Sequence, residues 1–532
     1  MFNDQIYITR SSDVDLELMK ADLDQIVKLP PIFDGCYVAS PEGVPEFKIL
    51  VNGEWRQSSS GSLIEVKSPI DRIVIARVQS GTASDAAEAV NSAYDSRKKI
   101  RDIPAIDRIN LLNRARHIIQ ENHEAFVRML VAEAGKTPES AEGEVRASLN
   151  RIKLTMQEAR SIFGEYVPGD WSEDTVAKFA LVIHEPLGVI TCITPFNYPL
   201  FSLVAKVIPA LVSGNSVMIK PATDDPLSSI LLSKVLQYSG IPDGAVNLVS
   251  GHGREVGDTI VSHKLVSMIT LTGSTETGKH VAKVSDMKKL HLELGGKGSA
   301  VVAEDADLAL ASKKILEGAL KFSGQRCDAI SRVLPFEKIH AALVARLMKD
   351  LASWELGDPR KEGITMGPLI NEEAANRVQL LVDDAVSKGA KLLHGGSHNG
   401  TYFEPTVLDN VPLDAKITWE ETFGPVVTII PVNDLDAAIK IVNDSHYGLD
   451  SCIFTESFYT AWKAAKSFEE GSVAINDAPA HGVGYFPFGG NKDSGLGREG
   501  VGHSLDEMTR LKTIQFNLAP AGLGKVRQKP KM

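Results

Sequence analysis

The amino-acid sequence predicts an α/β protein built around a parallel sheet with helices on both faces. From residue 187 to residue 296, short apolar runs alternate with segments of helical periodicity. Glycine or proline stands at the junctions between them. This alternation is typical of strand–helix–strand units, because consecutive parallel strands need a crossover between them.

The first part of the chain is expected to be largely helical. Residues 1–45 are interpreted as a loosely attached helical extension that ends at "KLPPIFDG". Apolar residues at three- and four-residue spacing then predict amphipathic helices over residues 83–100, 105–136 and 140–164. Residues 164–186 are interpreted as extended and rich in turns.

The parallel sheet is expected to follow. Its buried strands are predicted at residues 187–194, 215–221, 245–251, 265–274 and 289–296. The helices between them are predicted at residues 199–214, 226–240, 253–263 and 275–284. Sheets of this kind bind ligands beyond the carboxyl ends of their strands.

A second α/β segment is expected from residue 299 to about residue 500, where the turn-rich stretch "PFGGNKDSGLGREG" ends it. Residues 505–518 finish in a strand-like run with no partner left in the sequence. We expect this run to pair with residues 166–180 or with another subunit. The basic run "KVRQKPKM" at the end of the chain is interpreted as a solvated, frayed terminus.

Composition excludes several classes of partner. The 57 Lys and Arg against 68 Asp and Glu give a net charge of −11, which provides no electrostatic footprint for a nucleic acid. The most apolar region, residues 179–212, is interrupted by His184, Glu185 and prolines, so it is no transmembrane span. The N-terminus lacks the basic and apolar segments of a signal peptide. We therefore expect a soluble cytoplasmic protein without membrane partners.

The four cysteines are widely separated, with no CxxC pair and no Cys/His cluster at metal-ligand spacing, so we expect neither disulfide bonds nor a metal site. One of them, Cys327, lies in "FSGQRCDAIS" between an arginine and an aspartate. A buried cysteine is usually an inert apolar side chain. The guanidinium of Arg326, however, should favour the thiolate, which is the nucleophilic form.

A thiolate that attacks a carbonyl carbon needs a donor for the oxyanion, an acceptor for whatever leaves and a base that activates water. Three candidates lie at the ends of predicted strands. The Asn197 amide could donate to an oxyanion, Lys220 ends the next strand, and Glu293 precedes two glycines that would let a ligand approach closely. Each also has an ordinary interpretation as a turn amide, a solvated lysine or a strand-end glutamate.

Six motifs agree on one family. In order and spacing, the chain resembles the aldehyde dehydrogenase superfamily through "TPFNYP", "KPATDDP", "LTGSTETG", "LELGGK", "SGQRC" and "EETFGP". The resemblance extends from "VNGEW" at residues 51–55 to "MTRLKTIQFN" at residues 508–517. Only about the first 45 residues and the C-terminal tail fall outside it.

The resemblance implies a Rossmann-like parallel-sheet cofactor domain, a second α/β catalytic domain and a small β oligomerisation element. It divides the chain into an N-terminal extension at 1–45, a cofactor-binding domain at 46–165 and 183–292, a catalytic domain at 293–504, an oligomerisation element at 166–182 and 505–518, and a flexible tail at 519–532. It also implies a homo-oligomer, either a dimer or a tetramer.

The resemblance further implies a role for each candidate. Cys327 would add to an aldehyde, and the Asn197 side chain and the Cys327 N–H would hold the oxyanion of the thiohemiacetal. Hydride would pass to a nicotinamide cofactor, and Glu293 would activate the water that hydrolyses the thioester. The residues implied to bind the cofactor are Thr194, Pro195, Phe196, Lys220, Thr223, Gly253, Gly273, Ser274, Glu421 and Phe423. The family often has a glutamate at the position of Thr223 that repels a 2′-phosphate, so the threonine implies that NADP is accepted and preferred over NAD.

Within the superfamily, "EPLGVITCITPFNYPL", "SGQRCDAI" and "INDAPAHGVGYFPFGG" are most similar to the non-phosphorylating glyceraldehyde-3-phosphate dehydrogenases, especially the archaeal ones. This similarity implies that Arg326, Tyr198, His481 and Arg151 bind the phosphate of glyceraldehyde 3-phosphate. His481 departs from the pattern, because some members carry an arginine there. The matching arginine on the helix of Arg151 aligns about one turn earlier, near Ala147. Both arginines could instead pair with acids such as Asp328 or Glu144.

Three alternatives stay open. The substrate could be an unphosphorylated aldehyde such as glyceraldehyde, lactaldehyde or succinic semialdehyde. Coenzyme A could replace water as the acyl acceptor, although the retained Glu293 argues against it. The chain could also be a non-enzymatic relative, against which the intact set of Cys327, Glu293 and Asn197 argues.

Overall fold

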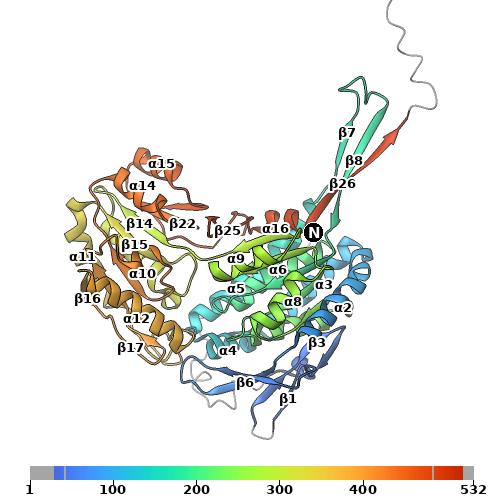
Figure 1. Cartoon of the computed structure of the whole chain (residues 1–532), viewed down its shortest axis with the longest axis horizontal. Helices are drawn as coiled ribbons and strands as arrows, with labels where there is room; N and C mark the ends of the chain where they lie inside the picture. The colour runs from blue at the N-terminus through green and yellow to red at the C-terminus, as the bar shows by residue number, and fades with distance from the viewer. Residues whose placement is uncertain (1–28, 41–42, 482–483, 519–532) are drawn as a thin grey trace, which may run out of the picture.

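The computed structural model describes residues 29–40, 43–481 and 484–518. Two α/β lobes lie side by side, and a long β arm extends from the N-terminal lobe (Figure 1). Residues 1–28 of the helical extension expected at 1–45, and the tail expected at 519–532, lie outside the described residues. None of the described helices is long and apolar enough to cross a membrane.

A mostly parallel sheet forms the centre of the N-terminal lobe. Its strands run in the order β25-β13-β12-β9-β10-β11-β3-β4, and β9 to β13 are mutually parallel. Their bounds are β3 (Ile49–Val51), β4 (Glu54–Arg56), β9 (Val189–Ile193), β10 (Ser216–Lys220), β11 (Val246–Leu248), β12 (Met268–Thr272), β13 (Lys289–Glu293) and β25 (Gly495–Leu496). The predicted α/β fold class is confirmed, and each predicted strand contains an observed one.

Helices cover both faces of this sheet. Alternate strand residues enter different apolar cores: Ile190 and Val217 belong to one, and Val189 and Met218 to the other. The helices on the first face are α3 (Ala105–Glu121), α4 (His123–Ala134), α5 (Pro138–Glu158), α6 (Pro199–Val212) and α7 (Leu227–Tyr238). Those on the second face are α2 (Ala83–Asp102), α8 (Asp258–Ser262) and α9 (Thr275–Val284).

Two predicted helices differ in detail. The helix expected over 105–136 is two helices, because Asn122 ends α3 and its side-chain amide donates to the Ile118 carbonyl at 2.8 Å. The helix expected over 253–263 begins with a π-helical turn, Gly253–Gly257, before α8. Both differences come from short-range hydrogen bonding that apolar spacing does not reveal.

The C-terminal lobe holds a second, mostly parallel sheet in the order β16-β19-β20-β15-β14-β22-β23. Its strands are β14 (Gly298–Val302), β15 (Ile330–Pro335), β16 (Lys391–His394), β19 (Thr406–Asp409), β20 (Val426–Ile429), β22 (Asp450–Phe454) and β23 (Ser472–Ile475). The helices of this lobe are α10 (Leu308–Leu320), α11 (Glu337–Leu351), α12 (Glu372–Ser387), α13 (Lys416–Trp419), α14 (Leu435–Asn443) and α15 (Phe458–Ser467). Short two-residue strands are β17 (His398–Asn399), β18 (Tyr402–Phe403), β21 (Tyr447–Gly448) and β24 (Asn491–Lys492).

The chain returns to the first lobe near its end. Strand β25 lies inside the range predicted for the catalytic domain, 293–504, yet it pairs with β13, where Gly495 faces Glu293. The return requires a glycine, because a Cβ on Gly495 would lie 2.1 Å from the Leu292 carbonyl oxygen. The two lobes are therefore joined by backbone pairing at the strand that carries Glu293.

The arm consists of β7 (Glu165–Pro168), β8 (Lys178–Pro186) and β26 (Thr509–Asn517), in the order β26-β8-β7. Helix α16 (Val501–Glu507) directly precedes β26 in the sequence. β26 pairs antiparallel with β8 along its whole length, from Thr509 opposite Pro186 to Asn517 opposite Lys178. The strand-like run at 505–518 therefore pairs within the chain, but its partner is residues 178–186, so the partner predicted at 166–180 is correct only at residues 178–180.

The end of the predicted N-terminal extension is not loosely attached. Strand β1 (Tyr37–Ala39) joins a small sheet with β2 (Pro45–Phe47), β6 (Val74–Gln79) and β5 (Leu63–Lys67). Phe33 is fully buried and packs edge-to-face against Phe126 of α4, with ring centroids 6.1 Å apart. The expectation is wrong for the described residues 29–40, because their aromatic side chains complete the core of the lobe.

We predict that Phe33→Ala destabilises the protein, because it removes a fully buried ring from this core. The expected cost is about 3–5 kcal/mol, seen as a lower urea midpoint of unfolding. Val38→Ala, at a position 42 % exposed, is the matched control and should leave the midpoint nearly unchanged. Equal midpoints for both variants would mean that residues 29–40 do not contribute to the core.

Candidate active site

A cavity of about 2090 Å³ lies between the lobes and is lined by residues from both. Pockets for one small ligand occupy about 300–1,000 Å³, so this cavity has room for a substrate and a larger molecule. The predicted site residues that line it are Cys327, Glu293, Asn197, Thr194, Pro195, Phe196, Gly273, Ser274, Glu421, Phe423, Tyr198, Arg326 and His481. Those that do not line it are Lys220, Thr223, Gly253 and Arg151.

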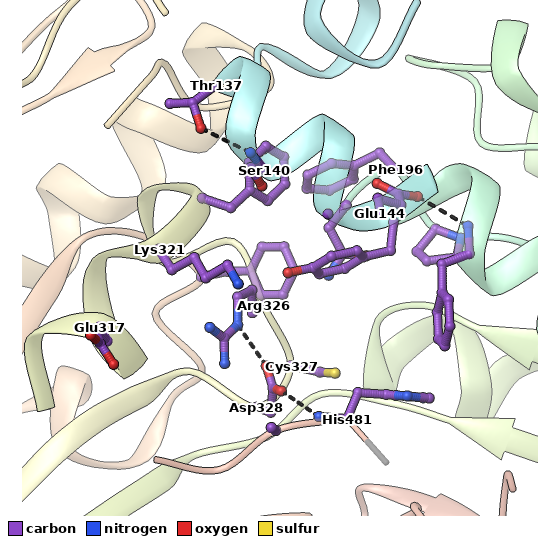
Figure 2. Close-up of a pocket in the computed structure, with 18 of the residues that line it drawn as sticks. Thr137, Ser140, Glu144, Phe196, Glu317, Lys321, Arg326, Cys327, Asp328 and His481 are labelled. Carbon is purple, nitrogen blue, oxygen red and sulfur yellow. Dashed lines mark hydrogen bonds and ion pairs between the residues drawn. The ribbon is translucent and has the colours of Figure 1, made fainter. Parts of the chain in front are cut away.

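A strained turn presents Cys327 to the cavity (Figure 2). After α10, Phe322 and Ser323 adopt left-handed backbone conformations with φ of 52° and 55°. Gly324 follows with φ of 70°, and a Cβ there would lie 2.2 Å from the Gly424 carbonyl oxygen. The Ser323 hydroxyl donates to the Gly367 carbonyl at 2.7 Å. Strain of this kind persists only where surrounding contacts hold it, and it is common at functional sites.

Gln325 and Asn197 fix the two sides of the cysteine. The Gln325 side-chain oxygen accepts a hydrogen bond from the Ile370 N–H at 2.8 Å, which anchors the turn to the second lobe. Asn197 Nδ2 donates to the Gln325 carbonyl at 3.0 Å and keeps its second N–H. The Cys327 N–H donates no hydrogen bond to the residues that the structure describes. Two N–H groups are therefore available beside the thiol.

Arg326 is paired with Asp328 beside the thiol. Its Nε donates to Asp328 Oδ1 at 2.8 Å, and its Nη2 donates to the Pro479 carbonyl at 3.3 Å. Burial, followed by the charge of Asp328, raises the pKa of the Cys327 thiol well above its usual range. The expectation of a thiolate favoured by Arg326 is wrong, because Asp328 compensates the guanidinium charge. The alternative, an ion pair between Arg326 and Asp328, is confirmed.

Glu293 ends β13, and its carboxyl group is almost fully buried. Oε1 lies 3.0 Å from His291 Nε2, whereas Oε2 is buried and accepts no hydrogen bond from the described residues. Burial raises the pKa of this carboxyl, and the neighbouring His291 opposes that increase. One oxygen is thus held from behind, and the other is free for a molecule in the cavity.

The residues predicted to bind phosphate separate into two groups. Tyr198 and His481 line the cavity with Arg326. Burial raises the pKa of Tyr198, so its hydroxyl remains a proton donor. The backbone N–H of His481 donates to Asp328 Oδ2 at 3.0 Å, and the ring Nε2 of His481 lies 2.8 Å from Glu499 Oε2.

Arg151 does not enter the cavity. It lies on α5, one helical turn beyond the cavity-lining Ala147, and its side chain contacts the Gly484 carbonyl at 3.4 Å and the Ser504 hydroxyl at 3.5 Å. The alternative pairing with Glu144 is not observed either, because Glu144 pairs with the buried Lys136 at 2.6 Å. The different position of Arg151 on the helix explains both results.

Sequence reasoning missed Lys321. It follows α10 directly, lines the cavity, and its side chain points toward Arg326 (Figure 2). It forms no ion pair within the part of the chain that the structure describes, so its charge is not compensated by contact. Arg146 of α5 is another cation of the lining. The sequence could have indicated Lys321, because this lysine stands only six residues before Cys327, in "KFSGQRC".

The other end of the cavity fits a dinucleotide. Gly273 and Ser274 lie where β12 gives way to α9, and Ser274 caps this ten-residue helix by accepting from the Thr277 N–H at 3.2 Å. Such a helix start suits a phosphate group. Glu421 accepts from the Gly296 N–H at 3.0 Å, and a Cβ on Gly295 would lie 2.7 Å from the Glu421 carboxylate. The backbone thus leaves space only for a glycine beside a carboxylate that can bind hydroxyl groups.

The remaining predicted cofactor residues lie around this region or behind it. The Phe196 and Phe423 rings meet edge-to-face with centroids 5.6 Å apart. Lys220 ends β10 behind the lining, and burial lowers its pKa to about 8. The Thr223 hydroxyl donates to the Gly251 carbonyl at 3.4 Å. Gly253 begins the π-helical turn before α8.

No group of three metal-ligating side chains occurs among the residues described.

The fold and the lining of the cavity agree with the family that the motifs indicated. A sequence profile described as the aldehyde dehydrogenase family matches residues 55–514. The chain belongs to the aldehyde dehydrogenase family, as its motifs predicted.

Known proteins similar to this chain support that assignment. An NADP-dependent glyceraldehyde-3-phosphate dehydrogenase from Streptococcus equinus is 37% identical over 89% of this chain and 99% of its own length. A 3-sulfolactaldehyde dehydrogenase from Priestia aryabhattai is 34% identical over 89% of this chain and 99% of its own. The crystal structure of NADP-dependent glyceraldehyde-3-phosphate dehydrogenase from Bacillus halodurans C-125, complexed with NADP, superposes with a TM-score of 0.87 at 39% identity and covers 89% of this chain and 99% of that one.

We predict that alkylation of Cys327 by iodoacetamide is slow at neutral pH and accelerates with pH, because burial and Asp328 keep the thiol protonated. The rate should rise about tenfold per pH unit between pH 6.5 and 8.5, since only the thiolate reacts. Mass spectrometry of the peptide measures it, with the fully buried Cys36, Cys192 and Cys452 as internal controls. A rate independent of pH over this range would restore the thiolate that the sequence suggested.

Proposed function

We propose that the protein oxidises glyceraldehyde 3-phosphate to 3-phosphoglycerate with NADP, without forming an acyl phosphate. The observation that carries this proposal is the pair of cations beside the nucleophile: Lys321, which has no ion-pair partner among the described residues, and Arg326. Two cations on one cavity wall suit a substrate with an anionic group. The relatives from Streptococcus equinus and Priestia aryabhattai are named for aldehydes that carry a phosphate and a sulfonate, which agrees with such a wall.

In the proposed acylation, Cys327 is the nucleophile. Its thiol gives its proton to water in the cavity, its sulfur adds to the aldehyde carbon, and the carbonyl oxygen becomes an oxyanion. The free N–H groups of Asn197 and Cys327 donate to that oxyanion, which lowers the barrier because these donors are already in place. The chemistry that a bound nicotinamide supplies is acceptance of the hydride, which leaves a thioester on Cys327.

In the proposed deacylation, Glu293 is the general base. Its free Oε2 takes a proton from water, the water oxygen adds to the thioester carbon, and the carbon–sulfur bond breaks. The products are a carboxylate and the Cys327 thiolate. A buried Glu293 with an unpaired oxygen favours water over coenzyme A as the acyl acceptor.

The proposed NADP preference rests on position 223. Thr223 is uncharged, and its hydroxyl already donates to a backbone carbonyl, so it offers no repulsion to a 2′-phosphate. Lys220, three residues earlier, would serve the adenosine ribose, and Glu421 the nicotinamide ribose. NAD should also be accepted, because nothing at these positions requires the extra phosphate.

We propose that the arm joins subunits in a cytoplasmic homo-oligomer, a dimer or tetramer. Apolar side chains are exposed along it: Tyr166 (64 %), Leu511 (65 %) and Phe516 (40 %). An apolar antiparallel ribbon that extends into solvent would lose this exposure against a second copy.

We also propose the domain division at 46–165 with 183–292 and at 293–504. Strand β25 is the exception, because it lies in the second range but pairs with the sheet of the first domain.

A second candidate is the oxidation of an unphosphorylated aldehyde. The ion pair between Arg326 and Asp328 favours it, because that cation is already compensated. Lys321 distinguishes the two functions, since it contributes only if the substrate carries an anion.

We predict that Lys321→Met lowers kcat/KM for glyceraldehyde 3-phosphate by about tenfold to hundredfold, the usual loss of one hydrogen bond to a charged group. The value for unphosphorylated glyceraldehyde should change little. Reduction of NADP measures both. Lys338→Met, an exposed lysine outside the cavity, is the matched control. Equal losses for both aldehydes in Lys321→Met would favour the second candidate.

We predict that Thr223→Glu moves the cofactor preference toward NAD. Two unit charges about 4 Å apart interact by roughly 4 kcal/mol at an effective dielectric constant near 20, so even a fraction of this repulsion changes the preference about tenfold. The measurement is the ratio of kcat/KM for NADP and NAD. Thr223→Gln has the same size without the charge and should keep the parental ratio; an unchanged ratio in Thr223→Glu would place the 2′-phosphate elsewhere.

A further inference from the structure

A buried imidazole lies directly behind Glu293. His291 is two residues earlier on β13 and is 1 % exposed. Its Nε2 lies 3.0 Å from Glu293 Oε1, and its Nδ1 lies 2.6 Å from Glu507 Oε2 on α16. The Glu507 side chain is 21 % exposed, so the three groups connect the cavity with the surface.

The two neighbouring carboxylates favour the positively charged form of the imidazole. Nε2 is within hydrogen-bond distance of Glu293 Oε1, whereas Nδ1 meets Glu507 at ion-pair distance without hydrogen-bond geometry, so attraction on that side is electrostatic. Burial opposes the charge, but the interactions with Glu293 and Glu507 outweigh it and raise the pKa of His291 to about 9. Two further charges act on this pair: Lys206 opposes the protonation of His291, and Glu499, whose Oε1 lies 3.4 Å from Lys206 Nζ, raises the pKa of Glu293.

The charge acts on one oxygen of Glu293. His291 holds Oε1, so rotation of the carboxyl group is restricted and Oε2 remains the oxygen without a partner. Glu507 is held in turn, because its Oε1 accepts from the Arg498 N–H at 3.1 Å. A group fixed from behind in this way needs little reorganisation when it takes a proton.

We propose that His291, held by Glu507, is a positioning residue for deacylation: it fixes Oε1 of Glu293 so that Oε2 faces the attacking water as an ionised base. This inference rests on the proposed role of Glu293 as the general base. His291 does not touch the substrate, and its effect passes entirely through the carboxylate. Glu507 supports it from the partly exposed side.

The pH dependence of turnover tests this inference. His291→Gln keeps a hydrogen-bond donor but removes the charge, so the acidic limb of kcat should move about one pH unit upward. Turnover at pH 6.5 should then fall about tenfold and recover at alkaline pH, while the initial burst of NADPH persists. Glu507→Gln should shift the limb in the same direction by less. Asp506→Asn, an exposed neighbour on the same helix, is the matched control and should keep the parental profile.

The inference is overturned if kcat of His291→Gln depends on pH as in the parental enzyme. If that variant does not fold, Glu507→Gln decides by the same criterion, because its side chain is partly exposed. Glu293→Gln, assayed in parallel, separates this inference from the proposed function. A stall after the burst in Glu293→Gln, with parental profiles for His291→Gln and Glu507→Gln, would refute only the positioning role. Continued parental turnover in Glu293→Gln would refute the general base itself.

Discussion

The cost of burying charge determines how this active site is built. An unpaired ion in the interior costs several kcal/mol, so each buried charge needs a partner. Asp328 meets this need twice, because it accepts from Arg326 Nε and from the His481 N–H and so ties together the segments on both sides of the cysteine. Lys136 and Glu144 form a second pair, fully buried beneath Tyr198. The shape of the cavity follows from these pairs.

The same carboxylates place the neighbouring backbone. Glu144 Oε1 accepts from the N–H groups of Leu200 and Phe201, each at 3.0 Å, at the start of α6. A negative charge there compensates the helix dipole and fixes the loop that carries Asn197. Glu144 on α5 therefore helps to position the side-chain amide of Asn197, which stands three residues before Leu200.

Sequence patterns predicted what depends on local order and missed what depends on contacts between distant segments. Apolar runs located the strands, because burial on both faces leaves a continuous signal. They could not show that Phe33 enters the core or that Arg151 turns away from the cavity, since both depend on which helices pack together. The motif predicted a reactive cysteine, and the structure places Cys327 in the lining of the cavity, but the motif did not reveal the environment that sets the pKa of its thiol. The position of Arg326 next to Cys327 in the sequence suggested that it favours the thiolate, whereas in the folded chain its guanidinium forms an ion pair with Asp328.

The return of β25 to the first sheet has a mechanical consequence. Leu292 pairs with Leu496 and Glu293 with Gly495, so a segment that follows the C-terminal lobe is hydrogen-bonded to the strand that carries Glu293. A rotation that separated the lobes would have to break this pairing or displace Glu293. This pairing therefore couples any change in the angle between the lobes to the position of Glu293.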